Sequence, residues 1–364
     1  MIDGHIQNSW VTNSTEELRK ILKRDVHFAS NPSTVKDLLN KEKVKISFGY
    51  RPSGIIHLGN INTFLLAAQT AIKVGTYKST LIVANQDLDL MSNRKYLPNL
   101  GLSNKEKRSY NPIFKYARTE NGNTHAQEYG QLIEDFLREM SEFAGIDIEI
   151  NKMSEINRDE EFRGLVKKVC DRNDSITQFF EDDKAELIEQ TKGGVLIYPI
   201  HPECKVTRWR GSKYNDGNIT MEMPNLGEDL EFDIENTNYE FGVHFLLSPL
   251  RDLTQKYGAD VHIHGGDRVD GENERFLKIQ KTAAILDLVS DERNIPILTV
   301  GPTIYGENGS KMSKILDNGL TLQKIREING KNTLNKLMEY SKYIIDSGLS
   351  AVDFSVTEER LLRK

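Results

Sequence analysis

The chain has 364 residues, of which 38% are hydrophobic and 28% are charged, and its formal net charge is −6. This composition predicts a globular protein with a sizeable core and argues against broad, non-specific binding to nucleic acid. No apolar run reaches the roughly 20 residues that cross a bilayer, and the N-terminus lacks the pattern of a secretory signal. Two cysteines are too few for a disulfide framework, so we expect a cytoplasmic protein with no membrane partner.

The first part of the chain predicts a βαβ unit. Residues 1–42 predict a polar, partly helical lead-in. Apolar runs at 44–50 and 79–85 predict buried strands, and the helical periodicity of 61–74 lies between them. Such strands pair in parallel through a right-handed crossover, and ligands of such sheets bind beyond the carboxyl ends of the strands.

The remaining elements extend this α/β pattern. In chain order we expect a long helix (125–145) that Gly145 ends, a strand (146–151), charged helices (158–192), short strands and turns (193–232), a helix interrupted by Pro249 (239–258), a strand (259–266), a helix (271–286), a strand (295–304) and a helical tail from Thr321. We therefore predict an α/β fold with a doubly wound parallel sheet, a helical and β-rich insertion, and a short helical tail. The predicted divisions are the lead-in (1–42), a catalytic domain (43–316) with an insertion at about 152–238, and a C-terminal segment (317–364).

Three polar corners follow predicted strands, and these carry the functional signal. They are "HLGN" (57–60), "HGGD" (264–267) and "GSKMSK" (309–314). A glycine pair after a strand is often only a turn, and a pair of lysines is often only a solvated face. Their order along one α/β chain favours a phosphate-binding site formed by a helix N-terminus, glycines and lysines.

The stretch "PSGIIHLGN", followed far downstream by "SKMSK", resembles the paired nucleotide-binding motifs of class I aminoacyl-tRNA synthetases, written HIGH and KMSKS. His57 and Gly59 match the first motif, with Leu58 in place of isoleucine and Asn60 in place of the second histidine; Lys311, Met312, Ser313 and Lys314 match the second, with Ile315 in place of the last serine. The resemblance implies a Rossmann-like nucleotide-binding domain that forms an aminoacyl-adenylate from ATP with Mg²⁺.

The residue types suit that reaction, in which the protein positions ATP and stabilises charge. His57 can donate to developing phosphate charge, Asn60 can donate or cap the helix, and Lys311 and Lys314 can stabilise pyrophosphate. Asp267 can accept from the ribose hydroxyls, or it can be a helix N-cap instead. The implied ATP site comprises Ser53, Gly54, His57, Gly59, Asn60, Gly265, Gly266, Asp267, Lys311, Met312, Ser313 and Lys314, of which His57, Asn60, Lys311 and Lys314 have catalytic roles.

Within the class, residues 44–316 are most similar to class I lysyl-tRNA synthetases, through "QDLDLMSNRKYLPN", "FAGIDIEI" and "YPIHPECKV". A basic amino acid needs a carboxylate, and Asp87 and Asp89 are candidates; the alternative is that they pair with Arg94 or Lys95 or cap the next turn. Tyr50, Tyr198 and Trp209 are expected to wall the amino-acid pocket.

Two departures from the lysyl pattern affect partners. Where that family carries cysteine pairs, only His201 and Cys204 remain, so we expect no metal there unless His262 or His264 completes a site. The segment after the second motif is too short for the family's anticodon-binding domain, and the acidic balance weakens the case for tRNA. The alternatives are transfer to a non-tRNA acceptor, a non-catalytic sensor of a nucleotide or amino acid, and nucleotidyl transfer to a small molecule.

Overall fold

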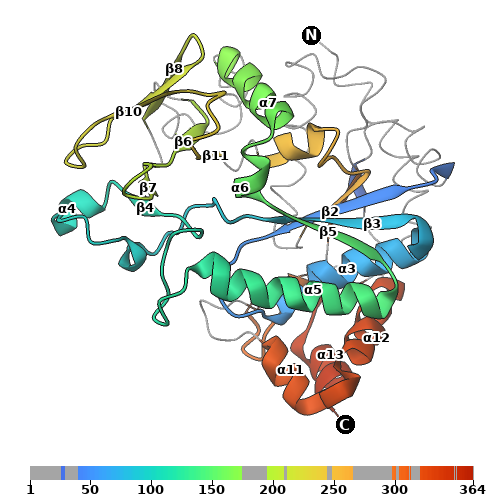
Figure 1. Cartoon of the computed structure of the whole chain (residues 1–364). Coiled ribbons are helices and arrows are strands. Elements are labelled where there is room, and N and C mark those ends of the chain that lie inside the picture. The colour runs from blue at the N-terminus through green and yellow to red at the C-terminus, as the bar shows by residue number, and fades with distance from the viewer. Residues whose placement is uncertain are drawn as a thin grey trace.

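The structure is a computed structural model of the chain (Figure 1). It describes residues 26–28, 40–173, 195–208, 211–243, 248–264, 297–300, 303–310, 312, 320–347, 349 and 351–363. Most of the predicted lead-in and the whole of the predicted helix over 271–286 lie outside these residues.

A six-stranded sheet forms the centre of the fold. In spatial order its strands are β1 (Val26–Phe28), β13 (Ile297–Val300), β12 (Val261–His264), β2 (Val44–Tyr50), β3 (Ser79–Asn85) and β5 (Asp147–Lys152). All neighbours are parallel except β1, which pairs antiparallel with β13. The chain builds the sheet outward from β2 through β3 to β5 and then returns to add β12 and β13 on the other side of β2. This order confirms the predicted doubly wound sheet and places its topological switch point between β2 and β12.

Apolar side chains fix the helix that follows β2. The helix α3 (Leu58–Val74) covers one face of the sheet together with α5 (Gln131–Ala144), and the C-terminal helices lie beneath them (Figure 1). The ring of Phe64 on α3 lies 5.3 Å from that of Phe48 on β2 and 6.3 Å from that of Phe136 on α5, between centroids. All three rings are buried, and each contributes about 1.5–3 kcal/mol. The start of α3 is therefore held rigidly against the carboxyl end of β2.

The predicted long helix over 125–145 is confirmed, with one irregularity. A π-helical turn, η3 (Ala126–Gly130), precedes α5 (Gln131–Ala144). The helix ends at Gly145, which has the left-handed conformation that glycine favours (φ 65°, ψ 41°). The π turn follows the long segment between β3 and α5. Its last residue, Gly130, lies beside Asn85 at the carboxyl end of β3, so the first residues of α5 lie at the carboxyl edge of the sheet.

The insertion has a core of its own, on the side of the sheet opposite α3 (Figure 1). Its elements are α6 (Met153–Ile156), α7 (Glu160–Asp171), β6 (Ile197–Pro199), β7 (Val206–Thr207), β8 (Ser212–Asn215), β9 (Asn218–Met221), β10 (Leu230–Asp233), β11 (Phe241–Val243) and η4 (Ser248–Leu253). The excursion after β3 contains η2 (Arg94–Tyr96), α4 (Asn104–Lys107) and β4 (Asn111–Pro112), and β4 pairs with β7.

The prediction of a helix over 239–258 is wrong. Residues 241–243 form strand β11, which pairs antiparallel with β6, and a 3₁₀ helix follows at 248–253. The side chain of Asn157 holds β11, donating to the Phe241 carbonyl at 2.9 Å and accepting from its N–H at 3.4 Å. These distant contacts override the helical periodicity, because a sequence pattern does not contain them.

The predicted strand over 295–304 is two strands, and the predicted helical tail is confirmed. β13 stays in the central sheet, whereas β14 (Thr303–Ile304) pairs in parallel with β15 (Ala351–Val352). The other elements are η1 (Thr76–Lys78), α11 (Leu322–Asn329), η6 (Gly330–Asn332), α12 (Thr333–Asp346), α13 (Phe354–Thr357) and η7 (Glu358–Leu362). Among the described residues, no helix is long and apolar enough to cross a membrane.

Candidate active site

The "HLGN" corner forms the start of α3. His57 is the N-cap residue, with an extended backbone (φ −118°, ψ 163°), and its Nδ1 accepts a hydrogen bond from the Gly59 N–H at 3.1 Å. Because Nδ1 is the acceptor, we assign the proton of the neutral imidazole to Nε2, which makes Nε2 a donor. A donor beside a helix N-terminus is suited to bind a phosphate group.

Gly59 is required by the imidazole of His57. A Cβ at position 59 would lie 2.9 Å from His57 Cε1 and 3.0 Å from Nδ1, closer than real Cβ contacts. The glycine therefore lets the ring fold against the first turn of α3. Asn60 is exposed in the same turn, and its N–H donates to the His57 carbonyl at 2.9 Å.

A segment from the other end of the chain pairs with this corner. The Leu58 N–H donates to the Leu320 carbonyl at 2.8 Å, and the Leu322 N–H donates to the Ile56 carbonyl at 3.0 Å. These bonds flank an antiparallel bridge between His57 and Thr321. The residues just after the second motif therefore hold the first motif by its backbone.

Met312 of the second motif lies at the same place. Its side chain is 2% exposed, its N–H donates to the Ile304 carbonyl at 2.8 Å, and its thioether accepts from the Leu320 N–H at 3.3 Å. The Met312 carbonyl lies 3.8 Å from the point where a Gly59 Cβ would be. The structure thus places Met312, the one described residue among Lys311–Lys314, beside the first motif, far from it in the sequence.

The other predicted ATP-site residues fall into two groups. In the turn after β2, the Ser53 N–H donates to the Arg51 carbonyl at 2.8 Å, and Gly54 has a φ of 145° that disfavours other residues. Gly265, Gly266, Asp267, Lys311, Ser313 and Lys314, together with Trp209 of the predicted amino-acid pocket, lie outside the described residues.

Polar side chains lie near the switch point, on the face of the central sheet opposite α3. Gly49 is exposed although it lies in central strand β2, which marks an open surface there. Further along that face, His262 Nδ1 lies 2.5 Å from Ser47 Oγ and 3.0 Å from Asp252 Oδ2, and Arg251 donates to Asp252 Oδ1 at 2.7 and 3.0 Å. Burial alone would raise the pKa of Asp252, but Arg251 and His262 hold that pKa below its usual value.

Tyr50 and Asp87, both predicted for the amino-acid pocket, are buried and hydrogen-bonded. The Tyr50 hydroxyl, at the end of β2, donates to Glu134 Oε1 at 3.2 Å. The Asp87 carboxylate accepts from the Ser154 N–H at 2.9 Å and from its hydroxyl at 2.6 Å, so it caps the start of α6. Burial raises the pKa of both side chains. The partner of Asp87 is therefore Ser154, 67 residues further along the chain, rather than Arg94, Lys95 or the next turn.

Asp89 and Tyr198 lie beside Arg51. Asp89 pairs with Arg51 at 2.6 Å, rather than with Arg94 or Lys95, and the side chain of Arg51 is 50% exposed. Tyr198 is buried, its hydroxyl donates to the Leu88 carbonyl at 3.4 Å, and its ring lies against Gly242, where a Cβ would overlap it. Burial raises the pKa of Tyr198, so its hydroxyl is a neutral donor.

Sequence analysis missed a cluster of interacting side chains around Glu240. Near Asp87, Glu240 accepts from the Lys115 ammonium and the Tyr116 hydroxyl and lies 3.5 Å from Arg158 NH2. These residues come from the segment after β4, the turn between α6 and α7, and the position just before β11. No local spacing signals them, because only the fold brings the three segments together.

His201 and Cys204 do not form a metal site with described neighbours. His201 Nδ1 accepts backbone N–H groups from Glu203 at 3.2 Å and from Cys204 at 3.1 Å, which stabilises a turn. Burial lowers the pKa of His201 and raises that of Cys204. Within the described part of the chain, no group of three or more histidine, cysteine or acidic side chains is arranged to hold a metal ion.

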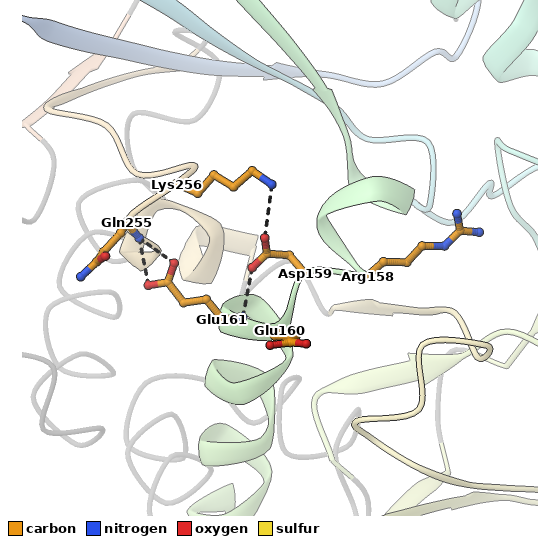
Figure 2. A pocket seen from close by; sticks show the side chains of 6 residues that line it. All are labelled: Arg158, Asp159, Glu160, Glu161, Gln255 and Lys256. Carbon is orange, nitrogen blue, oxygen red and sulfur yellow. Dashed lines mark hydrogen bonds and ion pairs between the residues drawn. The ribbon is translucent and has the colours of Figure 1, made fainter.

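A hollow of about 660 Å³ lies at the start of α7, apart from the first motif. Figure 2 shows the side chains that line it. The hollow is lined by Arg158, Asp159, Glu160, Glu161, Gln255 and Lys256. Asp159 caps α7 and lies 3.5 Å from the Lys256 ammonium, and both Glu161 carboxylate oxygens accept from the Gln255 N–H, at 2.9 and 3.0 Å. Polar side chains alone line this hollow, and its main acidic groups already have partners, so the motif corner is the better candidate site.

Comparison with known proteins places this geometry in context. The family model described as tRNA synthetases class I (K) matches residues 19–242. The structure is similar to the tyrosyl-tRNA synthetase complexed with L-tyrosine from Archaeoglobus fulgidus, at 15% identity and a TM-score of 0.43, covering 92% of this chain and 83% of that one. It is also similar to the tyrosyl-tRNA synthetase from Aeropyrum pernix, at 13% identity and a TM-score of 0.41, covering 86% and 71%. No curated protein sequence matches the chain.

Proposed function

The chain belongs to the family of class I (K) tRNA synthetases, which are ligases that use ATP, and on this premise we propose that it activates lysine or another basic amino acid and transfers it to tRNA. The observation that supports the proposal is the position of Met312 of the second motif beside the first motif. His57 and Gly59 lie at the start of α3, Leu320 accepts the Leu58 N–H through its carbonyl, and the Met312 thioether accepts the Leu320 N–H.

The proposed reaction follows from the residue types at the corner. The amino-acid carboxylate attacks the α-phosphorus of ATP, a new oxygen–phosphorus bond forms, and the bond to pyrophosphate breaks. His57 and Asn60 stabilise negative charge on the phosphate, and Lys311 and Lys314 stabilise the departing pyrophosphate. Mg²⁺ would accompany the ATP phosphates, as in other phosphate-transfer reactions.

The proposed ATP site includes further residues. Ser53 and Gly54 lie in the turn before the corner, and Gly265 and Gly266 follow β12 in the sequence. Asp267 accepts hydrogen bonds from the ribose. We retain the proposed division into a lead-in (1–42), a catalytic domain (43–316) and a C-terminal segment (317–364), except that β1 of the lead-in joins the central sheet, and we propose the cytoplasm as the compartment.

For a cationic substrate, Asp89 is the better of the two proposed carboxylates. Its partner Arg51 is half-exposed, and such a pair contributes only about 0–1 kcal/mol, so a substrate ammonium can replace the guanidinium. Asp87 is bound twice by Ser154 and acts by holding α6 in place. Tyr50, Tyr198 and Trp209 complete the proposed amino-acid site.

The acceptor and the amino acid are tested together. Purified chain is incubated with ATP, Mg²⁺ and each amino acid in turn, and the adenylate and AMP are measured with and without total tRNA. The proposal is supported if adenylate forms only with lysine or arginine and if that amino acid, supplied radiolabelled, is then recovered on acid-precipitated tRNA. Adenylate formation without transfer to tRNA would favour a non-tRNA acceptor, which the net charge of −6 also suggests.

A further inference from the structure

Three oxygen-bearing side chains meet at the carboxyl ends of the two central strands, on the α3 side of the sheet. They are Tyr50, the last residue of β2, Asn85, the last residue of β3, and Glu134 in the first turn of α5. Tyr50 and Asn85 are register partners in the parallel pair, so their side chains leave the sheet side by side. We call these three residues the edge cluster.

The hydrogen-bond donors of the edge cluster converge on one carboxylate. The Tyr50 hydroxyl and the Asn85 amide both donate to Glu134 Oε1, each at 3.2 Å. This carboxylate fixes the orientation of the Asn85 amide, because the flipped amide would bring two acceptor oxygens together. The amide nitrogen of Asn85 therefore faces Glu134, and the other amide atom, Oδ1, is the oxygen.

The environment of Asn85 Oδ1 also indicates a missing ligand. Asn85 is fully buried, and its Oδ1 has no hydrogen-bond partner among the described residues. A buried acceptor without a partner costs about 1–3 kcal/mol, so native proteins rarely leave one without an ion, a water or a ligand.

The Glu134 carboxylate of the edge cluster also forms no close ion pair. Glu134 is half-buried, and no described lysine or arginine nitrogen lies within 4.0 Å of its carboxylate. The exposed Arg138, one turn further along α5, acts on the cluster from beyond that distance, and its charge opposes the rise in the Tyr50 pKa that burial causes. The neighbouring acidic residues differ, since Asp89 pairs with Arg51 and Asp87 accepts two bonds from Ser154.

We propose that the edge cluster binds a small monovalent cation, such as potassium, sodium or ammonium. The available atoms are the Glu134 carboxylate, Asn85 Oδ1 and the lone pairs of the Tyr50 hydroxyl, all of which are hard oxygen acceptors. A water molecule would satisfy two acceptors but would leave the carboxylate charge in place. A divalent ion of the calcium type is usually bound by more than one carboxylate, whereas the single carboxylate of Glu134 balances the charge of a monovalent ion.

The position of the cluster suggests what the cation does. Gly130, at the end of the π turn, lies so close that a Cβ there would come within 3.3 Å of the Asn85 amide and 3.7 Å of the Pro52 Cβ. Pro52 belongs to the turn that leads to His57. A cation in the cluster therefore holds the start of α5 against both strand ends and against the turn that carries the first motif.

The test uses thermal unfolding of the full chain in chloride salts of potassium, sodium, ammonium and tetramethylammonium at equal ionic strength. We expect the wild-type midpoint to be about 2–4 °C higher in at least one small cation than in tetramethylammonium, with a saturable dependence on concentration. Glu134→Gln should abolish this difference and should be no less stable than wild type in tetramethylammonium. Asp135→Asn, which removes the neighbouring exposed carboxylate, should retain it.

Equal wild-type midpoints in all four salts would overturn the proposal, and would leave a water as the occupant. A retained cation dependence in Glu134→Gln, or a lost one in Asp135→Asn, would do so as well. If Glu134→Gln does not fold, Tyr50→Phe replaces it, because the ring still packs while one oxygen is lost. That variant should need several-fold more cation for half-saturation, and an unchanged requirement would contradict the site.

Discussion

The imidazole of His57 and the backbone of Gly59 form one unit: Nδ1 accepts the Gly59 N–H at 3.1 Å, and the ring occupies the space where a Cβ of residue 59 would lie. The two residues thus depend on each other for their conformation. This explains physically why a histidine is followed two positions later by a glycine at a helix start.

Gly59→Ala should therefore displace the imidazole and lower adenylate formation by roughly tenfold or more, since a loss of about 1.4 kcal/mol in transition-state stabilisation is tenfold. The measurement is amino-acid-dependent ATP–pyrophosphate exchange, with circular dichroism to verify folding. Gly164→Ala is the matched control, because that glycine lies within α7 and a Cβ there meets no atom within 4 Å. Equal activity in the two variants would show that the ring position does not matter.

Met312 should contribute both packing and a hydrogen bond. Met312→Ala removes a buried side chain from the main core and should cost about 2–5 kcal/mol of unfolding free energy. Met312→Leu keeps the volume but loses the acceptor for Leu320, so it should cost less than about 1.5 kcal/mol while raising the KM for ATP. Urea denaturation and exchange kinetics measure the two effects separately. An unchanged KM in Met312→Leu would argue against a role for the thioether.

Arg163 holds the insertion together and should tolerate no replacement. Its buried guanidinium donates to the carbonyls of Asn157, Ile234, Asn236 and Tyr239, at 2.6, 2.5, 3.0 and 2.5 Å. Burial lowers its pKa to about 10. Arg163→Lys leaves several carbonyls without donors and should lower the unfolding free energy by about 3–5 kcal/mol in urea. Arg108→Lys, at an exposed arginine, should change it little, and similar losses in both variants would contradict this account.

Asp252 should make stability depend on acidic pH. Its folded pKa is below the unfolded value near 4, so its contribution is present above about pH 4 and is lost as the pH falls below that value. Asp252→Asn should be less stable at pH 7, and its urea midpoint should fall less than that of wild type between pH 5 and pH 3. If the urea midpoints of the two proteins fall by the same amount between pH 5 and pH 3, Asp252 does not cause the pH dependence of stability.

The sequence predicts the central fold well because its signals there are local. The strands at 44–50 and 79–85 are short segments rich in β-branched and aromatic or other apolar residues, and the helix between them repeats its apolar residues at the helical period, so each element carries its own evidence. Strand β11 is the opposite case. Its helix-like pattern is overridden by Asn157, which lies in a different part of the chain.

The candidate site divides in the same way. His57, Gly59 and Met312 lie within recognisable motifs, and the structure brings them together. The partners of Tyr50 and Asp89, which are Glu134 and Arg51, follow no spacing rule. Their roles arise from the meeting of strand ends with a helix start and a turn, and such meetings exist only in the folded chain.

The most direct test of the account compares wild type with His57→Ala in ATP–pyrophosphate exchange, with each amino acid in turn. The account predicts exchange with lysine or another basic amino acid in the wild type, and a loss of roughly a hundredfold or more in His57→Ala, as for removal of a charge-stabilising donor. Exchange that continues at the wild-type rate in His57→Ala, or no exchange in wild type even when total tRNA is added, would contradict it.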